Sequence, residues 1–135
     1  MDLKTIEKLT SEKFWKTKSK LNRTKIQRVF DNYSKKIDNS TFSTSFLNSK
    51  FVSVNFYVKD EVLDSYVEFK FRFSPLNPRE SLNFSTEVDS LPEIRILYKD
   101  TTYRNYEIYN KALKRDINNK IKELNLMLAQ LEKML

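Results

Sequence analysis

Between residues 51 and 99 this chain alternates between apolar and polar residues with a period of two. Clean alternation is typical of an antiparallel sheet that buries one face. The segments 60–65, 74–81 and 90–92 that join the runs are short, which favours a simple meander. The residues expected on the buried face are Val52, Val54, Phe56, Val58, Val67, Phe69, Phe71, Phe73, Leu82, Phe84, Thr86, Val88, Ile94, Ile96 and Tyr98.

Residues 41–47 predict a further strand, but the pattern leaves its register open. A two-residue loop at Asn48 and Ser49 would pair Phe46 with Phe51 and place Phe42 and Phe46 on the second face of the sheet. The N-terminal helices would then have to cover that second face. A three-residue loop would instead turn both phenylalanines onto the main core face.

Helical periodicity is found at the two ends of the chain. The first 38 residues predict helices, the clearest over 23–37, where five apolar residues form one narrow stripe. These are Ile26, Val29, Phe30, Tyr33 and Ile37. A long helix is expected over 102–135, capped by Thr101 or Thr102. Its apolar residues follow spacings of four and three, as in a short heptad seam: Ile117, Ile121, Leu124, Leu128, Leu131 and Leu135.

These patterns predict one α+β domain over residues 1–135. We expect a basic helical segment at 1–38, a four- or five-stranded antiparallel meander at 41–100, and a long C-terminal helix at 102–135 packed on one sheet face. A chain of this length buries roughly two-thirds of its unfolded surface, so it needs no disulfide or metal to hold a core. Ten Phe, seven Tyr and one Trp supply large core side chains.

The chain contains no glycine, histidine or cysteine. Glycine-rich phosphate loops and the nucleophile elbow of hydrolases are therefore excluded, as are thiolate nucleophiles, imidazole bases and ordinary zinc sites. We expect a protein that is not an enzyme, with no cofactor and no metal. The absence of cysteine favours a reducing compartment, and no signal peptide or membrane-spanning segment is recognisable. A cytoplasmic location without a membrane partner is expected.

Positive charge is concentrated at the two ends of the chain. The formal net charge is +7, and residues 1–38 hold 11 Lys and Arg against 5 Asp and Glu. Residues 13–30 hold seven cations and no acid, whereas an ordinary solvent-exposed face mixes both signs. Lysines and arginines in such a run are suited to contact phosphates. The candidate nucleic-acid contacts are Lys13, Lys16, Lys18, Lys20, Arg23, Lys25, Arg28, Lys35 and Lys36.

Two further surfaces are candidates for contact with a partner. On the polar side of the predicted sheet, aromatic and cationic residues are interleaved in a way that suits stacking on bases: Tyr57, Tyr66, Lys70 and Arg72. On the C-terminal helix, the seam from Ile117 to Leu131 suits a dimer or a partner helix, because Leu126 and the apolar chain end also need cover. Each surface also has a plain structural interpretation, as solvated sheet face and as packing against the sheet.

The sequence therefore favours a small non-enzymatic accessory or regulatory protein that binds nucleic acid, as a homodimer, through its basic N-terminal helices. DNA and RNA are not distinguished. The alternative is a protein-interaction module, an inhibitor or adaptor, that docks on an acidic or nucleic-acid-binding surface. Frequent Lys, Asn, Ser, Phe and Ile are typical of AT-rich genes, as in low-GC bacteria, phages and plasmids.

Overall fold

In the described part of the chain, three helices are followed by five strands and one long helix. The computed structural model describes residues 3–37, 40–47, 50–60 and 63–135, with residues 40–47 described through their backbone pairing. The helices are α1 (Leu3–Leu9), α2 (Glu12–Lys16), α3 (Arg23–Ser34) and α4 (Tyr106–Lys133). The strands are β1 (Ser40–Leu47), β2 (Phe51–Asp60), β3 (Ser65–Phe73), β4 (Glu93–Tyr98) and β5 (Thr101–Tyr103). All neighbouring strands are antiparallel in the order β1-β2-β3-β4-β5, which confirms the predicted α+β class and meander.

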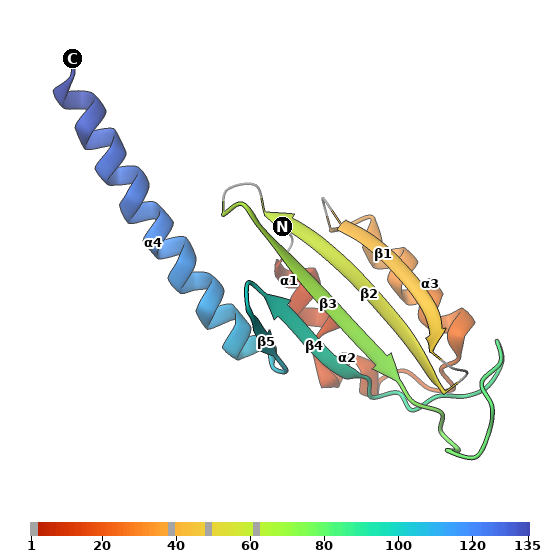
Figure 1. Ribbon diagram of the computed structural model, residues 1–135. Coiled ribbons are helices and arrows are strands. Elements are labelled where there is room, and N and C mark those ends of the chain that lie inside the picture. The colour runs from red at the N-terminus through yellow and green to blue at the C-terminus, as the bar shows by residue number, and fades with distance from the viewer. Residues whose placement is uncertain (1–2, 38–39, 48–49, 61–62) are drawn as a thin grey trace.

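The predicted alternation places the core on one face of the sheet. The inward residues of β2 and β3 are all buried. The register pairs Phe56 with Phe69 and Val54 with Phe71, so aromatic rings meet across the two central strands. The Phe56 and Phe69 rings stack with centroids 4.7 Å apart. Helices α1, α2 and α3 lie behind this face in Figure 1, and the opposite face is turned toward the viewer.

The register of β1 selects one of the two alternatives that its sequence leaves open. Leu47 pairs with Phe51 and Phe46 pairs with Val52, so three residues connect β1 to β2. This is the longer connection; Asn48 and Ser49 themselves lie outside the described residues. Val52 is an inward residue of β2, so its partner position in β1 belongs to the main core face as well. The N-terminal helices lie on this same face and therefore do not have to cover a second one.

The predicted strand over 82–88 is wrong. Outside the named strands, Val88 makes an isolated bridge to Pro75, and the remainder of this segment is a loop. The side chain of Asn83 accepts hydrogen bonds from the backbone N–H groups of Ser85 and Thr86, both at 3.0 Å. Such local bonds compete with a strand ladder, which explains why alternation alone misleads here. Leu82, Thr86 and Val88 are still buried, whereas Phe84 is 66% exposed.

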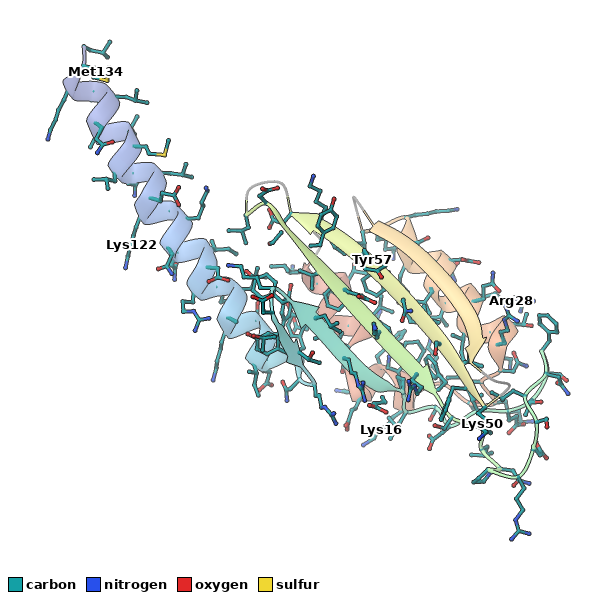
Figure 2. The ribbon with its side chains drawn as sticks, viewed as in Figure 1. Lys16, Arg28, Lys50, Tyr57, Lys122 and Met134 are labelled. Carbon is teal, nitrogen blue, oxygen red and sulfur yellow. The ribbon has the colours of Figure 1, made fainter. Side chains whose placement is uncertain are left out.

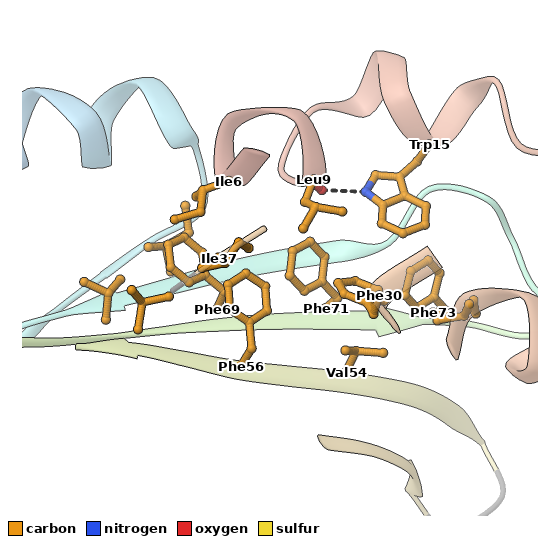
Figure 3. Packing of buried hydrophobic residues seen from close by; sticks show 14 of the residues in the cluster. Ile6, Leu9, Trp15, Phe30, Ile37, Val54, Phe56, Phe69, Phe71 and Phe73 are labelled. Atoms are coloured by element: carbon orange, nitrogen blue, oxygen red, sulfur yellow. Dashed lines mark hydrogen bonds between the residues drawn. The ribbon is translucent and has the colours of Figure 1, made fainter. Parts of the chain in front are cut away.

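Trp15 joins the N-terminal helices to the sheet. Its side chain is fully buried, and its indole Nε1–H donates a 2.6 Å hydrogen bond to the Leu9 carbonyl at the end of α1 (Figure 3). Its ring packs on Phe30 of α3 and on Phe73 of β3, with centroids 5.6 and 5.1 Å away. One side chain therefore ties α1, α2, α3 and β3 together. Four of the five predicted stripe residues lie in α3, which ends at Ser34, and Ile37 follows its end. All five belong to this core or pack against it.

The long helix begins later than the sequence pattern predicts. Thr101 and Thr102, the expected caps, belong to β5, and the helix starts at Tyr106. Asn105 is the cap, and its side chain accepts a 2.7 Å hydrogen bond from the Glu107 N–H. The Lys99–Asp100 turn between β4 and β5 has Lys99 in the left-handed region (φ 53°), which is unusual without glycine. This turn produces a three-residue strand that is too short to leave a periodic signal.

Only the first turns of α4 pack on the sheet. Tyr109, Ala112 and Leu113 are buried, and the Tyr109 ring contacts Phe69 and Tyr98 on the inward face. Residues 118–135 are nearly all exposed, and this part of the helix extends away from the sheet in Figure 1. Residues 118–133 span about 24 Å at 1.5 Å per residue. The expected packing of α4 on the sheet is thus limited to its N-terminal end.

Asp116 fastens the base of α4 to β4. Its carboxylate accepts a 2.6 Å hydrogen bond from the Tyr98 hydroxyl and lies 3.0 Å from the Lys99 ammonium. The pKa of Asp116 is held below its usual value, first by the bond from Tyr98 and further by Lys99. Burial and this same carboxylate raise the pKa of the Tyr98 hydroxyl. The contact therefore favours an ionised aspartate beside a neutral tyrosine.

Replacing Asp116 with alanine is expected to lower the free energy of unfolding by about 1.5–3 kcal/mol at pH 7, because hydrogen bonds to charged groups contribute about that much. The folded-state pKa is lowered, so the stabilisation is present above the unfolded pKa and is lost as pH falls through the folded value. Urea titrations at pH 7 and near pH 2 should show the gap from wild type closing in acid. Asp100→Ala, on an exposed turn, is the control; a D116A gap unchanged in acid would contradict this account.

Candidate nucleic-acid interface

The predicted basic residues lie on α2, on α3 and on the connections that flank α3. Lys18 and Arg23 are half-buried and the other seven are exposed, as a phosphate-binding surface requires. They do not form one continuous stripe, since Lys16 and Arg28 lie on well-separated parts of the surface in Figure 2. The candidate contacts include seven lysines. Among these lysines and Arg28, only Lys16 has a carboxylate of the described part of the chain within 4.0 Å, that of Glu12 at 3.9 Å. The cations of this surface are thus largely available to an anionic partner.

A groove between the N-terminal helices gathers cations around two aromatic rings. Its volume is about 550 Å³. Four lysines and one acid, Glu7, line it together with Phe14 and Tyr33. The lysines are Lys4, Lys8, Lys13 and Lys18. The local charge is therefore strongly positive.

Phe14 and Tyr33 are held at the groove by their neighbours in sequence. Phe14 precedes the buried Trp15, and their rings meet edge to face with centroids 4.9 Å apart. Tyr33 lies one turn after the buried Phe30, at the edge of the α3 stripe. The Phe14 and Tyr33 rings are 5.8 Å apart and nearly perpendicular, at 86°. Both side chains are half-buried, so the core fixes their position while part of each ring stays accessible.

Three lysine ammonium groups lie over these two rings. Lys18 is 4.7 Å from the Phe14 centroid, and Lys36 is 5.1 Å from the Tyr33 centroid. Lys8 lies between them, 5.6 Å from Phe14 and 5.5 Å from Tyr33. Exposed cation–π contacts contribute about 0.5–1 kcal/mol each. They are weak enough for a flat ligand to displace, and the freed lysines would remain beside it.

Lys4 and Lys8 are not among the contacts predicted from the sequence, yet they line the groove together with the predicted Lys13 and Lys18. The acid-free run starts only at residue 13, and Glu7 interrupts the positive charge before it. The i, i+4 spacing of Lys4 and Lys8 on one helix face was the available signal. This spacing points to the groove only when the packing of α2 against α1 through Trp15 is known.

The other predicted cations lie outside the groove. Arg23 lies over the exposed Phe84 ring of the 82–88 loop, with its guanidinium carbon 4.9 Å from the centroid. Lys20 takes a left-handed backbone conformation (φ 52°) in the connection from α2 to α3. The neighbouring Leu21 carbonyl accepts a 2.8 Å hydrogen bond from the Val88 N–H, which ties this connection to the loop. Lys25, Arg28 and Lys35 extend the cationic surface along α3.

The polar face of the sheet carries the four predicted secondary contacts. Tyr57 and Tyr66 are 44% and 61% exposed, and Tyr57 is labelled on the near face in Figure 2. Acids share this face: Glu68 lies 3.5 Å from Lys70, and its charge raises the pKa of Tyr57. Arg72 lies over Phe51, 4.8 Å from the centroid. Because acids neutralise part of the positive charge, this face is a weaker anion site than the groove.

A smaller hollow of about 140 Å³ lies on the same polar face. Ser53, Lys70, Arg72 and Arg95 line it, together with Glu93. Glu93 lies 2.8 Å from the Arg95 guanidinium and lowers the net positive charge of the hollow. The hollow therefore does not compete with the groove as an anion site.

The predicted C-terminal seam is divided by the fold. Ile117 packs against the domain core, whereas the rest of the seam is exposed to solvent. Ile121, Leu124, Leu128 and Leu131 are 45–59% exposed. Leu126, which lies off the seam, is 63% exposed, and Met134 near the free end is 81% exposed. Figure 2 shows Lys122 and Met134 on a helix standing clear of the sheet. Exposed apolar surface of this kind is typical of protein-interaction surfaces in general.

Among the described residues, no cluster of three or more acidic, His or Cys side chains is arranged to hold a metal ion. In the same part of the chain, no helix combines the length and apolar character needed to cross a bilayer. No protein-family model matches this chain, and comparison with curated proteins and with solved structures likewise found no match.

Proposed function

We propose that this protein binds nucleic acid through the cationic surface of its N-terminal helices and acts as a non-enzymatic accessory or regulatory factor. The observation that carries the proposal is the scarcity of acidic partners among those cations. Four groove lysines face one acid, and Lys25, Arg28, Lys35 and Lys36 are exposed on α3 and directly after it. Charges left unpaired over such an area favour a polyanion, whose counterions are released on binding.

The proposal includes a homodimer formed through the projecting part of α4. Ile121, Leu124, Leu128 and Leu131 are exposed on a helix that has no contact with the sheet beyond its first turns. Two copies that pair along this seam would also double the number of phosphate contacts. Linked sites gain affinity without any new contact, because the second binds at a high effective concentration.

The alternative remains a protein-interaction module. The same exposed stripe on α4 supports it, since a helix that presents an apolar face suits a groove on another protein. In that case the cationic helices would dock on an acidic partner surface. The two proposals differ in whether the purified protein binds oligonucleotides.

The test replaces Lys25, Arg28, Lys35 and Lys36 together with glutamine. Each lost phosphate contact should flatten the plot of log affinity against log salt by about 0.7 for single strands or 0.9 for duplex. We expect at least a tenfold loss of affinity near physiological salt in fluorescence anisotropy with labelled oligonucleotides. The melting temperature should be almost unchanged, because all four side chains are exposed.

The matched control removes the same net charge from α4, by replacing the exposed Lys111, Lys114, Lys122 and Lys133 with glutamine. This control should bind nearly as tightly as wild type. Equal losses in both variants would mean that net charge, rather than the N-terminal surface, governs binding. A wild type that binds no oligonucleotide at low salt would overturn the nucleic-acid proposal in favour of the protein-partner alternative.

A further inference from the structure

We infer that the groove lined by Lys4, Lys8, Lys13, Phe14, Lys18 and Tyr33 binds unpaired nucleobases together with their phosphates. The ligand would be a single-stranded segment of nucleic acid. This inference rests on the proposed function and goes further, because it names the ligand class and adds Lys4, Lys8, Phe14 and Tyr33 to the contact surface. The cations alone would serve a duplex equally well; the two rings are what distinguish this groove.

The two rings are placed so that a ligand can reach them. Trp15, which is itself stacked on Phe30, holds Phe14 from the core side, and Phe14 in turn contacts Tyr33. The groove lies on the other side of these two rings. A cation–π contact forms over the face of a ring, so the groove-lining Lys8 and Lys18 identify faces of Phe14 and Tyr33 that point into this space. A base that enters would take the place of an ammonium group above a ring.

On binding, each displaced lysine ammonium group exchanges a ring for a phosphate, and the ring exchanges the ammonium group for a base. The displaced ammonium groups have long flexible stems and need to move only a short way to meet the phosphates on either side of the base. Stacking of one base on an aromatic side chain changes affinity roughly 5- to 150-fold, whereas losing an exposed cation–π contact costs only a few-fold. Since the lysines regain a charged partner, the balance favours the ligand.

The angle between the rings excludes paired bases. Successive bases in one strand of a duplex are parallel and about 3.4 Å apart. The Phe14 and Tyr33 rings stand at 86° with centroids 5.8 Å apart. Bases that stack on both rings must therefore turn away from each other. Only an unpaired strand allows that, and single-strand binding proteins combine aromatic platforms with a cationic groove in this way.

The experiment replaces Phe14 and Tyr33 with leucine, which keeps apolar bulk against Trp15 but removes the flat rings. Affinity is measured for labelled oligo-thymidine and for a labelled duplex of equal length. Single-strand affinity should fall at least tenfold, with an unchanged salt dependence because no charge is removed. Duplex affinity should change less than about twofold. Tyr103→Leu, a half-buried aromatic of β5 that packs on Tyr109 away from the groove, is the matched control and should bind like wild type.

A second variant, Lys4→Gln with Lys8→Gln, keeps the inference testable if the aromatic variant melts early. It should flatten the single-strand salt plot by about 1.4, which corresponds to two phosphate contacts at 0.7 each.

Equal losses of single-strand and duplex affinity, or no loss at all in either groove variant, would overturn this inference. The proposed function would still stand on the α3 cations. A wild type that binds neither oligonucleotide would instead reject the proposed function itself.

Discussion

Replacing Trp15 with alanine is expected to destabilise the fold by about 3–5 kcal/mol, the usual cost of removing a large aromatic side chain from a core. The indole is fully buried, packs on Phe30 and Phe73, and donates a hydrogen bond to the Leu9 carbonyl. A domain has only about 5–15 kcal/mol of stability in total. With a urea m-value near 2 kcal/mol/M, the unfolding midpoint should fall by about 1.5–2.5 M.

Two further variants separate the contributions of Trp15. Trp15→Phe keeps an aromatic ring but removes the N–H donor, so its loss should be clearly smaller than that of alanine. Tyr66→Ala removes an exposed aromatic side chain from the other sheet face and should stay within about 0.5 kcal/mol of wild type. A Trp15→Ala protein within 1 kcal/mol of wild type would mean that the N-terminal helices contribute little to the core, contrary to the packing described above.

The sheet and α3 could be predicted because their burial repeats along the chain. The period-two runs of β2 and β3 and the stripe of α3 each depend on one buried face. Sequence alone failed where a few residues decide the outcome. The register of β1 depends on one residue in a loop, and Asn83 converts an alternating run into turns. Strand β5 has only three residues, too few for a pattern.

The candidate site could be predicted only in part. Its cations were visible as an acid-free run, but the groove depends on how three helices dock. Lys4 and Lys8 come from α1, Phe14 from α2 and Tyr33 from α3, and the contacts of Trp15 bring these elements together. The heptad spacing of α4 was also visible, yet spacing could not separate Ile117, which packs on the domain, from Leu131, which is exposed. Tertiary contacts decide both which residues line the groove and which part of the α4 seam is exposed.

Replacing Leu131 with glutamate is expected to convert a homodimer into a monomer. Leu131 is 59% exposed and continues the stripe of Ile121, Leu124 and Leu128 along the projecting helix. Two copies that bury these four side chains gain enough apolar contact for a Kd in the micromolar range, about −7 to −8 kcal/mol. A glutamate in the seam would lose its hydration on association without gaining a partner of opposite charge. The Kd should therefore rise at least 100-fold.

Leu126→Glu is the matched control for this variant. Leu126 is 63% exposed, about as much as Leu131, but lies roughly 140° away around the helix axis. The control introduces the same residue into the same helix and should remain dimeric. Light scattering on a size-exclusion column at tens of micromolar would compare the three proteins. Equal dissociation by both substitutions would point to loss of the helix, not of the seam.

Circular dichroism gives an independent measure of the same contact. Residues 118–133 have few stabilising contacts of their own, apart from the Lys120–Glu123 pair at 3.5 Å, and an isolated helix of this length is marginal in water. Association should therefore maintain this part of α4, so Leu131→Glu should lose helical signal while Leu126→Glu keeps it. A wild type that stays monomeric at tens of micromolar, yet remains fully helical, would contradict the homodimer. The exposed seam would then fit a helix-binding groove on a different protein, as the interaction-module alternative requires.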